Sequence, residues 1–388
     1  MDSEKLKVAI VLEATLGGTR KHVVDLISFL PSDTFDITFI YSSKRGDDRF
    51  KVDIEWFKTS GYNCVELPMT TKLHSLLNVL CILKMIALFK AKKIEVIHLH
   101  GAVAGALGRA AALFCKGIRK IVYSPHGGVL HKMNASISSK LYLFIEQLLT
   151  TKKVFIVAVS SEEKEKVSKF IKIPSSKIKL IPNGIDLGNL KQQKISPIEI
   201  AKERNRLQIA NDDFVFLYPA LFLEAKGHVH FFETVLNKKL SFNRNIKILL
   251  AGDGPLLSRV RELTDALPFR EQIQYLGFVK NINLYFQLAD AVMLPSVNEA
   301  FGYVLIEAMA FEKTIFATNV GGIKDIVENK RTGFLYDVDN LPAMINDMNY
   351  YSGHRECLID IGKNSIEWVT QKFDISQTVG QIKQLYKE

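Results

Sequence analysis

The stretch DAVMLPSVNEAFGYVLIEAMA, residues 290–310, combines a buried strand, a polar loop and the start of a helix. The apolar run ends at Pro295, and the pattern predicts a helix from near Phe301. Glu299 lies in the loop and Glu307 about two turns into the helix, so a rise of ~1.5 Å per residue separates the carboxylates by roughly 10 Å. Such a separation suits two hydroxyl-bearing rings better than one proton shared between carboxylates.

The start of this helix also offers unpaired backbone amides. The N–H groups of Phe301, Gly302 and Tyr303 have no partner within the helix, so they would face an anionic group placed between the two glutamates. A simpler interpretation puts one glutamate at a helix start and the other on a solvated face. The segment taken alone is compatible with both interpretations.

Outside this segment, short apolar and β-branched runs alternate with longer amphipathic stretches, such as the helical patterns at 19–30, 73–91 and 136–150. This alternation predicts an α/β fold in which helices cover both faces of a parallel sheet. The predicted strands are 7–13, 36–41, 63–67, 95–99, 120–124, 154–159 and 179–181, followed by 214–218, 246–251, 273–276, 291–294, 314–317 and 334–336.

The two runs of strands are separated by a segment rich in Gly, Pro, Asn and Asp, at 182–197, where we place a linker. We expect a first domain over 1–185, a second over 186–370, and a C-terminal helix over 371–388 that packs back toward the first domain. Ligands bind at the carboxyl ends of the strands in open parallel sheets. Two doubly wound, Rossmann-like domains would therefore face each other across a central cleft.

The composition is that of a globular protein with a full core, since 47% of the 388 residues are hydrophobic and 24% are charged. Cys64, Cys81, Cys115 and Cys357 form no C-x-x-C pair, so neither a disulfide framework nor a zinc site is expected, and a reducing cytoplasm fits. The first residues lack the features of a signal peptide. The most apolar window, 73–89, is too short and too broken by charge to predict a transmembrane anchor.

The net charge of +10 comes from the first half of the chain. This asymmetry indicates an anionic partner, such as nucleic acid, a phospholipid surface or a lipid-linked diphosphate, although a well-solvated basic surface gives the same pattern. Basic residues flank very apolar helical patterns here. One interpretation is peripheral attachment to an anionic membrane, and the other is that the apolar faces pack on the sheet. The basic residues are Lys84, Lys90, Lys92, Lys93, Lys116, Arg119 and Lys120.

A glycine turn follows the first predicted strand, in TLGGTRKH at 15–22. Gly17 and Gly18 let the backbone approach a ligand closely, and the helix that begins here offers free N–H groups to a phosphate. A tight turn alone would explain the two glycines equally well. The absence of G-x-G-x-x-G counts against a dinucleotide site.

Metal chemistry has little support in the sequence. His98 and His100 point to the same side of one predicted strand, but two histidines are too few for a closed metal site. His100 lies at the strand's carboxyl end and is a candidate for lining a ligand pocket. Asp337 and Asp339 precede a predicted helix, where a turn and a helix cap account for them. The chain has no G-x-S-x-G elbow and no Walker loop.

At 290–310 the chain resembles the retaining glycosyltransferases of family 4 (glycosyl transferases group 1), whose signature has two glutamates with seven residues between them, as Glu299 and Glu307 have. Further matches follow in order along nearly the whole chain: LGGTRKH at 16–22, SPHGG at 124–128, IPNGID at 181–186, EAKGH at 224–228, AGDGP at 251–255, LGFV at 276–279, GGIKDIV at 321–327 and TGFLYD at 332–337. The resemblance implies a two-domain GT-B fold that binds acceptor in the first domain and nucleotide sugar in the second.

The resemblance also implies roles for individual residues. Lys226 would pair with the donor diphosphate, Glu299 would hydrogen-bond the sugar hydroxyls, and Glu307 the ribose hydroxyls. Gly18 would lie against the diphosphate, and His126 would reach the sugar or the reaction centre. The catalytic candidates are thus His126, Glu299 and Lys226; the donor-binding candidates are Gly17, Gly18, Lys226, Gly254, Glu299, Phe301, Gly302, Tyr303 and Glu307; and the acceptor-binding candidates are His100 and Arg20.

One position departs from the family pattern. An arginine usually stands five residues before the lysine as a second diphosphate clamp, and Leu221 stands there instead. Loss of a bidentate arginine weakens donor binding and leaving-group stabilisation. Arg20 and Lys21, beside the glycine turn, are the first candidates to replace its charge. An altered donor geometry and a reduced activity are the alternatives.

We therefore expect a retaining, metal-independent hexosyltransferase. It would move a hexosyl or N-acetylhexosaminyl group from a nucleotide sugar, UDP before GDP, to a glycan hydroxyl in cell-surface polysaccharide or lipid-linked oligosaccharide synthesis. No cofactor, metal ligand or nucleic-acid partner is expected. The expected location is cytoplasmic, with peripheral attachment to the inner face of the plasma membrane left open. The alternatives are a sugar-nucleotide epimerase on the same fold and a non-catalytic nucleotide-sugar-binding partner.

Overall fold

The computed structural model describes residues 4–72, 75–128 and 137–388, which divide into two units. Unit 1 contains Met1–Gly184 and Ile375–Glu388, and unit 2 contains Ile185–Asp374. The C-terminal segment is therefore part of the unit that the N-terminal half builds, so the backbone connects the two units twice.

Unit 1 is built on a seven-stranded parallel sheet with the order β3-β2-β1-β4-β5-β6-β7. The strands are β1 (Leu6–Leu12), β2 (Phe35–Tyr41), β3 (Asn63–Glu66), β4 (Val96–His100), β5 (Lys120–Ser124), β6 (Val154–Ala158) and β7 (Ile178–Leu180). The helices are α1 (Gly17–Phe29), α2 (Asp48–Thr59), α3 (Leu76–Ala91), α4 (Ala102–Ala112), α5 (Ile137–Leu149), α6 (Ser161–Phe170) and α16 (Ile375–Lys387).

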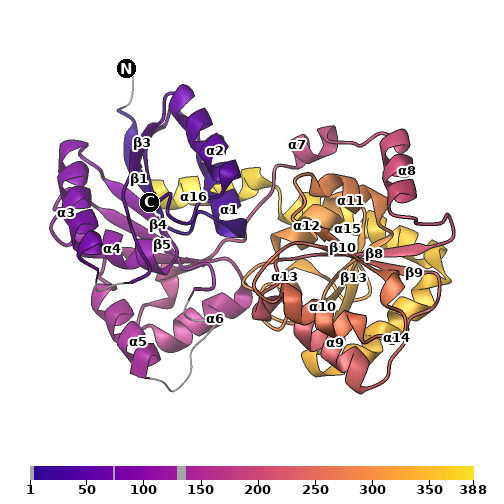
Figure 1. Cartoon of the computed structure of the whole chain (residues 1–388). Coiled ribbons are helices and arrows are strands. Elements are labelled where there is room, and N and C mark those ends of the chain that lie inside the picture. The colour runs from indigo at the N-terminus through magenta and orange to yellow at the C-terminus, as the bar shows by residue number, and fades with distance from the viewer. Residues whose placement is uncertain (1–3, 73–74, 129–136) are drawn as a thin grey trace. The chain divides into compact units, whose positions relative to one another are not determined.

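Helices cover both faces of this sheet (Figure 1). On one face α3, α4 and α6 bury apolar side chains such as Met85 and Leu107. On the other face α1, α2 and α16 do the same, for example through Leu26 and Ile382. Because the central strands are covered on both sides, they consist of nearly continuous apolar residues, as the sequence pattern indicated.

The C-terminal helix α16 is tied to unit 1 by specific contacts. The hydroxyl of Tyr386 lies 2.6 Å from Nδ1 of His98 in β4. A Cβ atom on Gly184 would lie 2.6 Å from the Cα atom of Ile375, so the lack of a side chain at Gly184 allows this close approach to the start of α16. The helix therefore belongs to the unit 1 core.

Unit 2 is built on a six-stranded parallel sheet with the order β10-β9-β8-β11-β12-β13. In Figure 1, α9, α10 and α14 cover one face of it, and α11, α12 and α15 cover the other. The strands are β8 (Phe214–Pro219), β9 (Ile246–Ala251), β10 (Ile273–Gly277), β11 (Ala291–Leu294), β12 (Thr314–Thr318) and β13 (Gly333–Tyr336). The helices are α7 (Leu187–Gln192), α8 (Pro197–Arg206), α9 (His228–Asn237), α10 (Leu257–Asp265), α11 (Ile282–Leu288), α12 (Tyr303–Ala310), α13 (Ile323–Ile326), α14 (Leu341–Ser352) and α15 (Ile359–Lys372).

The predicted fold class, two doubly wound parallel-sheet domains, is confirmed, and each predicted strand is present with ends within one residue of those expected. The linker segment is not wholly irregular, because Asp186 caps α7 by accepting the N–H of Asn189 at 2.9 Å. Asp337 and Asp339 lie in the turn before α14, as expected, but neither caps that helix, whose N-cap residue is Asn340. No helix within the described residues is long and apolar enough to cross a membrane.

Candidate active site

Both sheets follow the same plan, in which the direction of winding reverses beside the first strand. In unit 2 the reversal lies between β8 and β11, and in unit 1 it lies between β1 and β4. Loops that leave the carboxyl ends of such a strand pair diverge, and the crevice between them is where open α/β sheets bind ligands. The site residues predicted from the sequence follow β8, β9 and β11 in unit 2; in unit 1 they follow β1 and β5 or, as His100 does, end β4.

Lys226 and Glu299 meet at the winding reversal of unit 2. Lys226 ends the short 3-10 helix η3 (Glu224–Lys226) after β8, and Glu299 lies in the loop after β11. The Lys226 ammonium donates to the Glu299 carboxylate, and the two side chains are only 24% and 10% exposed. The hydroxyl of Tyr218 donates to the backbone carbonyl of Lys226 and fixes that turn. A cation and a carboxylate are thus presented together.

Two glycines set the distance between the loops of this site. Gly227 has a φ of 80°, and a Cβ atom there would lie 1.9 Å from the carbonyl oxygen of Pro295. Gly321 has a φ of 53°, and a Cβ atom there would lie 1.6 Å from the carbonyl oxygen of Glu299. A side chain at either position would push the loops apart. The glycines of EAKGH and GGIKDIV therefore position Lys226 and Glu299.

The helix α12 begins directly after this loop, as predicted. Its N-cap residue, Gly302, has a φ of 104° and, as a glycine, has no side chain with which to cap the first turn. The sequence assigns the amides of Phe301, Gly302 and Tyr303 to an anion, and of these only Tyr303 lies within the helix. Phe301 is buried against Phe373, with ring centroids 5.9 Å apart, and anchors the loop. Glu307 is partly buried on the second turn of α12.

The loops after β8 and β9 touch each other through Gly254. A Cβ atom on this glycine would lie 2.7 Å from the carbonyl oxygen of Phe222, so the AGDGP motif allows close packing of the two loops. Leu221, which stands where the family pattern has arginine, is 44% exposed. The position is therefore open to solvent and would accommodate a longer side chain.

His228 is a residue of this site that sequence reasoning missed. Its ring stacks between those of Tyr218 and Phe222, with centroid distances of 3.9 Å and 4.2 Å. Burial lowers the pKa of His228 to about 3, so the imidazole is neutral. Among the described residues neither ring nitrogen has a hydrogen-bond partner. The ring thus packs as an aromatic spacer that supports the turn carrying Lys226, and only its position after that turn hinted at this.

In unit 1, α1 begins at the glycine turn, as predicted. Gly17 has a φ of 65°, and Gly17 and Gly18 are both exposed. The N-cap residue Leu16 makes no side-chain hydrogen bond to the first turn. Because α1 is a helix of 13 residues, its exposed N-terminus offers amides and a partial positive charge to an anion.

The two basic residues beside this turn already have partners. Arg20 pairs with Asp53 of α2, and Lys21 pairs with Asp25 at 3.3 Å. Their charges therefore help to join and stabilise helices within unit 1. Either residue would have to leave or share its carboxylate partner in order to bind a diphosphate in place of the missing arginine.

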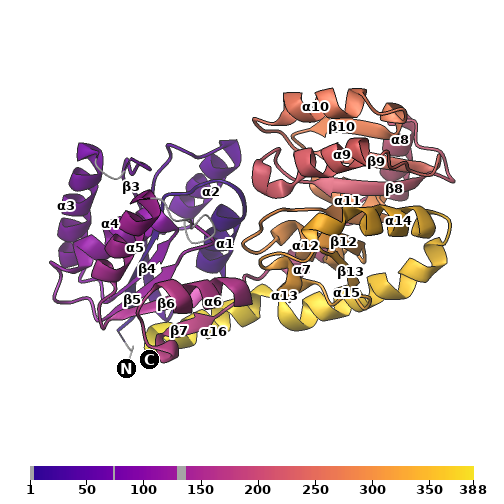
Figure 2. The same cartoon turned by 90° about the horizontal axis from the view of Figure 1, so that it is seen from below.

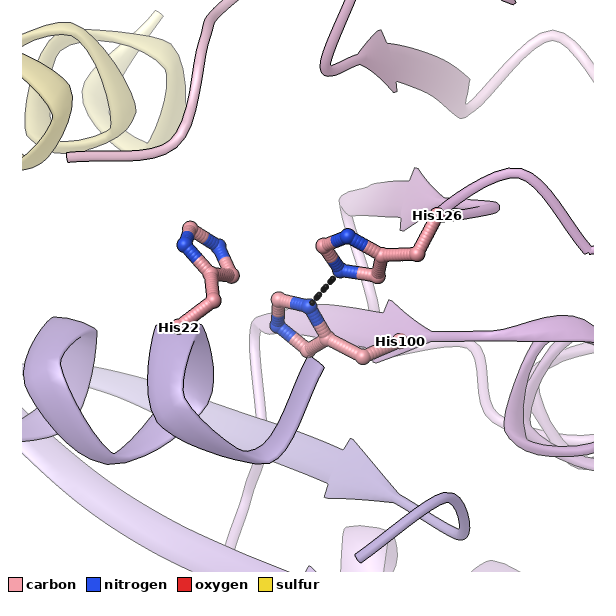
Figure 3. Close-up of side chains that lie close together, drawn as sticks. All are labelled: His22, His100 and His126. Atoms are coloured by element: carbon pink, nitrogen blue, oxygen red, sulfur yellow. Dashed lines mark hydrogen bonds between the residues drawn. The ribbon is translucent and has the colours of Figure 1, made fainter. Parts of the chain in front are cut away.

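Three histidines from three elements converge at the carboxyl edge of the unit 1 sheet (Figure 3). His22 comes from α1, His100 ends β4, and His126 lies in the loop after β5. Nδ1 of His100 lies 2.9 Å from Nε2 of His126, and one ring nitrogen from each histidine lies within 4.8 Å of the other two. Their spacing in the sequence gave no sign of this meeting.

The sequence had paired His100 with His98 instead. The two do lie on the same side of β4, with ring centroids 4.0 Å apart. However, the ring nitrogens of His98 contact Tyr386 and the Ser124 hydroxyl, the latter at 2.9 Å. His98 is therefore a structural residue, and the histidines that gather around His100 are His22 and His126, which the sequence did not group with it.

The clustered histidines are neutral. Burial lowers the pKa of His22 to about 4, and burial together with neighbouring histidines lowers the pKa of His100 and of His126 well below the usual value. Neutral imidazoles donate and accept hydrogen bonds, and they also bind metal ions. Three histidine nitrogens are the ligand set of some catalytic zinc sites. The prediction of a metal-free enzyme stays a prediction, and this cluster is where it must be tested.

A buried carboxylate holds the loop that carries His126. His126, Gly127 and Gly128 have φ values of 53°, 80° and 36°, an unusual run of three positive angles. Glu163 of α6 accepts the N–H of Gly127 at 2.5 Å and that of Val159 at 2.8 Å. Glu163 is fully buried, and burial raises its pKa to about 7. Its segment, SSEEKEK, looks like an exposed helix start, so the sequence did not single it out.

Two family models match the two halves of the chain. Residues 16–189 match the model described as Glycosyltransferase Family 4, and residues 199–368 match that of Glycosyl transferases group 1. Together the matched ranges contain all the candidate site residues of both units. The protein belongs to glycosyltransferase family 4.

Relatives of this family 4 glycosyltransferase align along most of its length. The UDP-Gal:alpha-D-GlcNAc-diphosphoundecaprenol alpha-1,3-galactosyltransferase of Escherichia coli is 24% identical over 98% of this chain and 97% of its own. The capsular polysaccharide biosynthesis glycosyltransferase CapM of Staphylococcus aureus is 25% identical over 82% of this chain and 83% of its own.

Solved structures show the same fold. The structure of Anabaena HepE in complex with UDP and glucose matches with a TM-score of 0.80 and 21% identity, over 98% of this chain and 99% of that one. WaaG, a glycosyltransferase involved in lipopolysaccharide biosynthesis, matches with a TM-score of 0.73 and 12% identity over 98% and 99%. The family 4 glycosyltransferase described here is therefore an enzyme with the GT-B fold.

Proposed function

We propose that the protein transfers a hexosyl or N-acetylhexosaminyl group from a UDP-sugar to a glycan hydroxyl, with retention of anomeric configuration and without a metal ion. The pairing of Lys226 with Glu299 in the loop that leads into α12 carries this proposal. A nucleotide sugar combines a diphosphate anion with a hydroxyl-rich ring. A lysine and a carboxylate held together complement these two features.

The choice of UDP and of a cell-surface glycan is supported by the relatives. The E. coli relative is named for a UDP-Gal donor and a GlcNAc-diphosphoundecaprenol acceptor, and HepE is described in complex with UDP and glucose. CapM is named for capsular polysaccharide biosynthesis. We extend to this protein a UDP-sugar donor and an acceptor on a polysaccharide or lipid-linked oligosaccharide.

Each residue of unit 2 has a defined task in this scheme. Cleavage of the sugar–phosphate bond adds negative charge to the nucleotide diphosphate, so Lys226 and the first amides of α12 would bind the transition state more tightly than the substrate. Glu299 would accept hydrogen bonds from sugar hydroxyls, and Glu307 from the ribose. In unit 1, Gly18 would lie against the diphosphate, and neutral His126 would hydrogen-bond the sugar.

The retaining step needs no covalent glycosyl-enzyme. The bond from sugar C1 to the diphosphate oxygen breaks, and the bond from C1 to the acceptor oxygen forms on the same face. The proton of the acceptor hydroxyl passes to the departing diphosphate oxygen. The diphosphate thus serves as the base, so the neutral histidines of unit 1 are needed only to orient hydroxyl groups.

A donor panel tests the proposal. The purified protein is incubated with UDP-, GDP-, ADP- and dTDP-sugars, and the thermal shift and nucleotide release are measured beside Glu299→Gln and Glu307→Gln. The matched control is Glu262→Gln, which removes an exposed carboxylate paired with Arg259 on α10. We expect stabilisation and slow nucleotide release with UDP-sugars, lost in both site variants and kept in the control.

Other outcomes would favour the alternatives. Isomerisation of the donor without any acceptor would identify an epimerase on the same fold. Tight donor binding without transfer to any glycan would identify a non-catalytic binding partner, for which Leu221 in place of arginine is the structural hint. Binding of no donor by the folded protein would contradict the assignment of Lys226 and Glu299.

We also propose that unit 1 attaches to an anionic membrane. Figures 1 and 2 show α3, α4 and α5 as neighbours over one part of unit 1. Cys81, Met85 and Phe89 of α3 are buried in the core, but other large apolar side chains of these elements are between 40% and 80% exposed. They are Leu76, Leu77, Val79, Leu80 and Leu83 on α3, Leu113 and Phe114 after α4, and Phe144 and Leu148 on α5.

Basic side chains accompany this apolar surface. Lys84, Lys90 and Lys116 are exposed on or beside α3 and α4, and each such charge adds about 1 kcal/mol of attraction near an anionic leaflet. Arg119 is also exposed but lies 3.8 Å from Glu95. Lys120 does not contribute, because it is buried.

Vesicle sedimentation tests the attachment. The protein is mixed with phosphatidylcholine vesicles with or without phosphatidylglycerol, at low and high salt. We expect binding only to the anionic vesicles, weakened by salt and by the double change Leu80→Gln and Leu83→Gln. Ile198→Gln, at an exposed position of unit 2, is the control. Equal sedimentation of all variants, or a dimer that the Leu changes disrupt, would contradict a membrane-binding surface.

A further inference from the structure

The histidine cluster of unit 1 has the spacing of a metal site. Among the described residues, His22, His100 and His126 are the one group of three or more potential ligands whose ligand atoms all lie within 4.8 Å of one another. The side chains approach one another from α1, from the end of β4 and from the loop after β5 (Figure 3). Three separate elements therefore direct one nitrogen each toward a common point.

The distances between the nitrogens suit a tetrahedral ion. Zinc–nitrogen bonds of ~2.0–2.1 Å place two nitrogen ligands roughly 3.3 Å apart. Nδ1 of His100 and Nε2 of His126 lie 2.9 Å apart, close to this spacing. Because no pair exceeds 4.8 Å, the farthest pair has to close by at most about 1.5 Å, which is within the reach of side-chain rotation.

Two of the three rings carry a buried nitrogen without a partner. His22 is 3% exposed and His100 is 0% exposed. Within the part of the chain that the structure describes, Nδ1 of His22 and Nε2 of His100 have no hydrogen-bond partner. A buried polar atom without a partner costs free energy, and a bound ion would recover part of that cost by taking up imidazole lone pairs.

His126 connects the cluster to a space from which an ion can enter. It is only partly buried, and it lines a cavity of about 360 Å³ together with Glu13, Arg45 and Glu146. Glu13 pairs with Arg45 at 3.3 Å, and Glu146 pairs with Arg109 at 2.7 Å. These pairs leave no uncompensated positive charge among the described residues of the wall, so a cation is not repelled. The cavity also has room for a water molecule as fourth ligand.

We propose that His22, His100 and His126 bind a transition-metal ion, Zn²⁺ in particular, and that this ion inhibits the enzyme. Imidazole nitrogens suit zinc, cobalt, nickel and copper, whereas Mg²⁺ and Ca²⁺ require oxygen ligands and would not bind. The ion replaces the hydrogen bond between His100 and His126 and takes His126 away from the donor sugar. The metal site stands on the geometry alone, and its inhibitory effect rests on the proposed glycosyl transfer.

Cobalt titration tests the site without requiring turnover. Co²⁺ absorbs visible light, most strongly when it is four-coordinate. The full-length protein is freed of metal by chelation and titrated with Co²⁺, and calorimetry then gives the affinity for Zn²⁺. We expect one bound Co²⁺ per chain, displaced by Zn²⁺ but not by Mg²⁺ or Ca²⁺. His22→Gln and His100→Gln should each weaken Zn²⁺ binding by at least about tenfold, the lower end of the loss for removing a group that only supports a ligand.

His354→Gln is the matched control. His354 is an exposed histidine of unit 2, three residues from the exposed Cys357, so it is where an ion would bind non-specifically at the surface. We expect this variant to keep the cobalt spectrum of the wild type. A spectrum lost in His354→Gln and kept in His22→Gln would show surface binding only and would overturn the inference.

A less buried ligand provides a second variant. Because His22 and His100 are buried, thermal unfolding is used to show that their variants are folded. His126→Gln changes the partly buried ligand, on a loop rather than on a helix or strand. A folded His126→Gln protein that binds Zn²⁺ as tightly as the wild type does would overturn the inference.

Inhibition is measured as the ratio of nucleotide-release rates with and without added Zn²⁺. We expect the rate of the wild type to fall in proportion to the occupancy of the site, and that of His22→Gln to respond less at the same Zn²⁺ concentration. Stimulation by Zn²⁺, or a full site without inhibition, would contradict the inhibitory effect.

The metal site and the proposed function can fail separately. Failure of Co²⁺ and Zn²⁺ to bind contradicts the site, and a UDP-sugar-dependent thermal shift in the same samples leaves the proposed function standing. Zinc binding that the histidine variants lose, in a protein that responds to no nucleotide sugar, supports the site and contradicts the proposed transfer reaction.

Discussion

The Lys226 ammonium and the Glu299 carboxylate are hydrogen-bonded to each other between the two loops at the winding reversal of unit 2. Each charge satisfies the other, so the mostly buried pair avoids the cost of an isolated ion. A diphosphate that takes the lysine replaces one charge-assisted hydrogen bond with another. The carboxylate then accepts from a sugar hydroxyl, and donor binding leaves no buried charge without a partner.

Replacing the lysine should slow the chemical step, and it should also cost stability because it leaves the mostly buried Glu299 carboxylate without its partner. We expect Lys226→Ala to lower kcat/KM for the UDP-sugar by about 100- to 1,000-fold, the range for loss of one group that stabilises an oxyanion. Lys226→Arg should restore part of the activity because the charge returns in a different geometry. Lys238→Ala, at an exposed lysine after α9, is the control in the same nucleotide-release assay. Equal rates in all three variants would remove Lys226 from the mechanism.

Chelation tests whether the histidine cluster of unit 1 holds a metal ion. We expect prolonged treatment with EDTA to leave the nucleotide-release rate unchanged, since the proposed step relies on Lys226 and helix amides for charge stabilisation. Elemental analysis of the purified protein gives an independent measurement. Loss of activity that zinc restores in the wild type, but not in His22→Gln, would show that the three histidines are metal ligands.

The pH dependence of stability tests the buried Glu163. Its folded-state pKa of about 7 lies above the unfolded value of 4.5, so the stabilisation from its protonated form is complete below pH 4.5 and is lost as the pH rises through 7. The stability of the wild type relative to Glu163→Gln should therefore fall by roughly 3 kcal/mol between these limits. The free energies come from urea unfolding of both proteins at several pH values. The neighbouring histidines titrate in both proteins, so their effect cancels in the difference.

The difference in unfolding free energy between the wild type and Glu163→Gln could instead stay constant across this pH range. Such a result would mean that Glu163 is ionised in the folded protein throughout the range. A second readout is the rate of transfer. If Glu163 positions the loop of His126 through Gly127, then Glu163→Gln should lower kcat with little change in the donor KM. An unchanged kcat would assign Glu163 to stability alone.

The contact between His98 and Tyr386 should matter for stability. Tyr386→Phe removes the hydroxyl 2.6 Å from Nδ1 of His98 and leaves that buried nitrogen without a partner. We expect the free energy of unfolding to fall by about 1–3 kcal/mol. Tyr350→Phe, at a tyrosine that is 54% exposed, is the control. Equal urea midpoints for the two variants would show that apolar packing alone holds α16 on the unit 1 sheet.

The strands were predictable because a strand buried on both faces must be an apolar run, and such runs stand out locally in the sequence. The glycines of unit 2 were recognisable for a different reason, because they belong to short motifs. Gly227 and Gly321 occur in motifs, and the structure gives each a physical reason, the close approach of another backbone. Positions that depend on local pattern or on one backbone contact were therefore accessible from the sequence.

The convergence of side chains from distant elements was not accessible. His22, His100 and His126 meet because α1, β4 and the loop after β5 end at the same sheet edge, and no spacing in the sequence encodes that meeting. Glu163 was hidden for a related reason. A glutamate in the first turn of a helix is ordinarily solvated, and only the tertiary structure shows that this one is buried against Gly127.

Leu221 gives the sharpest test of how the family pattern applies to this protein. It occupies the position of the second diphosphate clamp, is 44% exposed, and precedes Lys226 in the same loop. If the donor diphosphate binds beside that loop, Leu221→Arg should add a bidentate partner and tighten UDP-sugar binding by about tenfold, more at low salt than at high salt. Leu223→Arg, at a leucine that is 39% exposed in the same loop, adds the same charge two residues away from the position of the family's arginine. Calorimetry with a UDP-sugar should therefore separate the two variants.

Similar gains in UDP-sugar affinity in both variants would point to non-specific attraction. No gain in either variant would mean that the diphosphate lies away from this loop and that Leu221 reflects a different donor geometry.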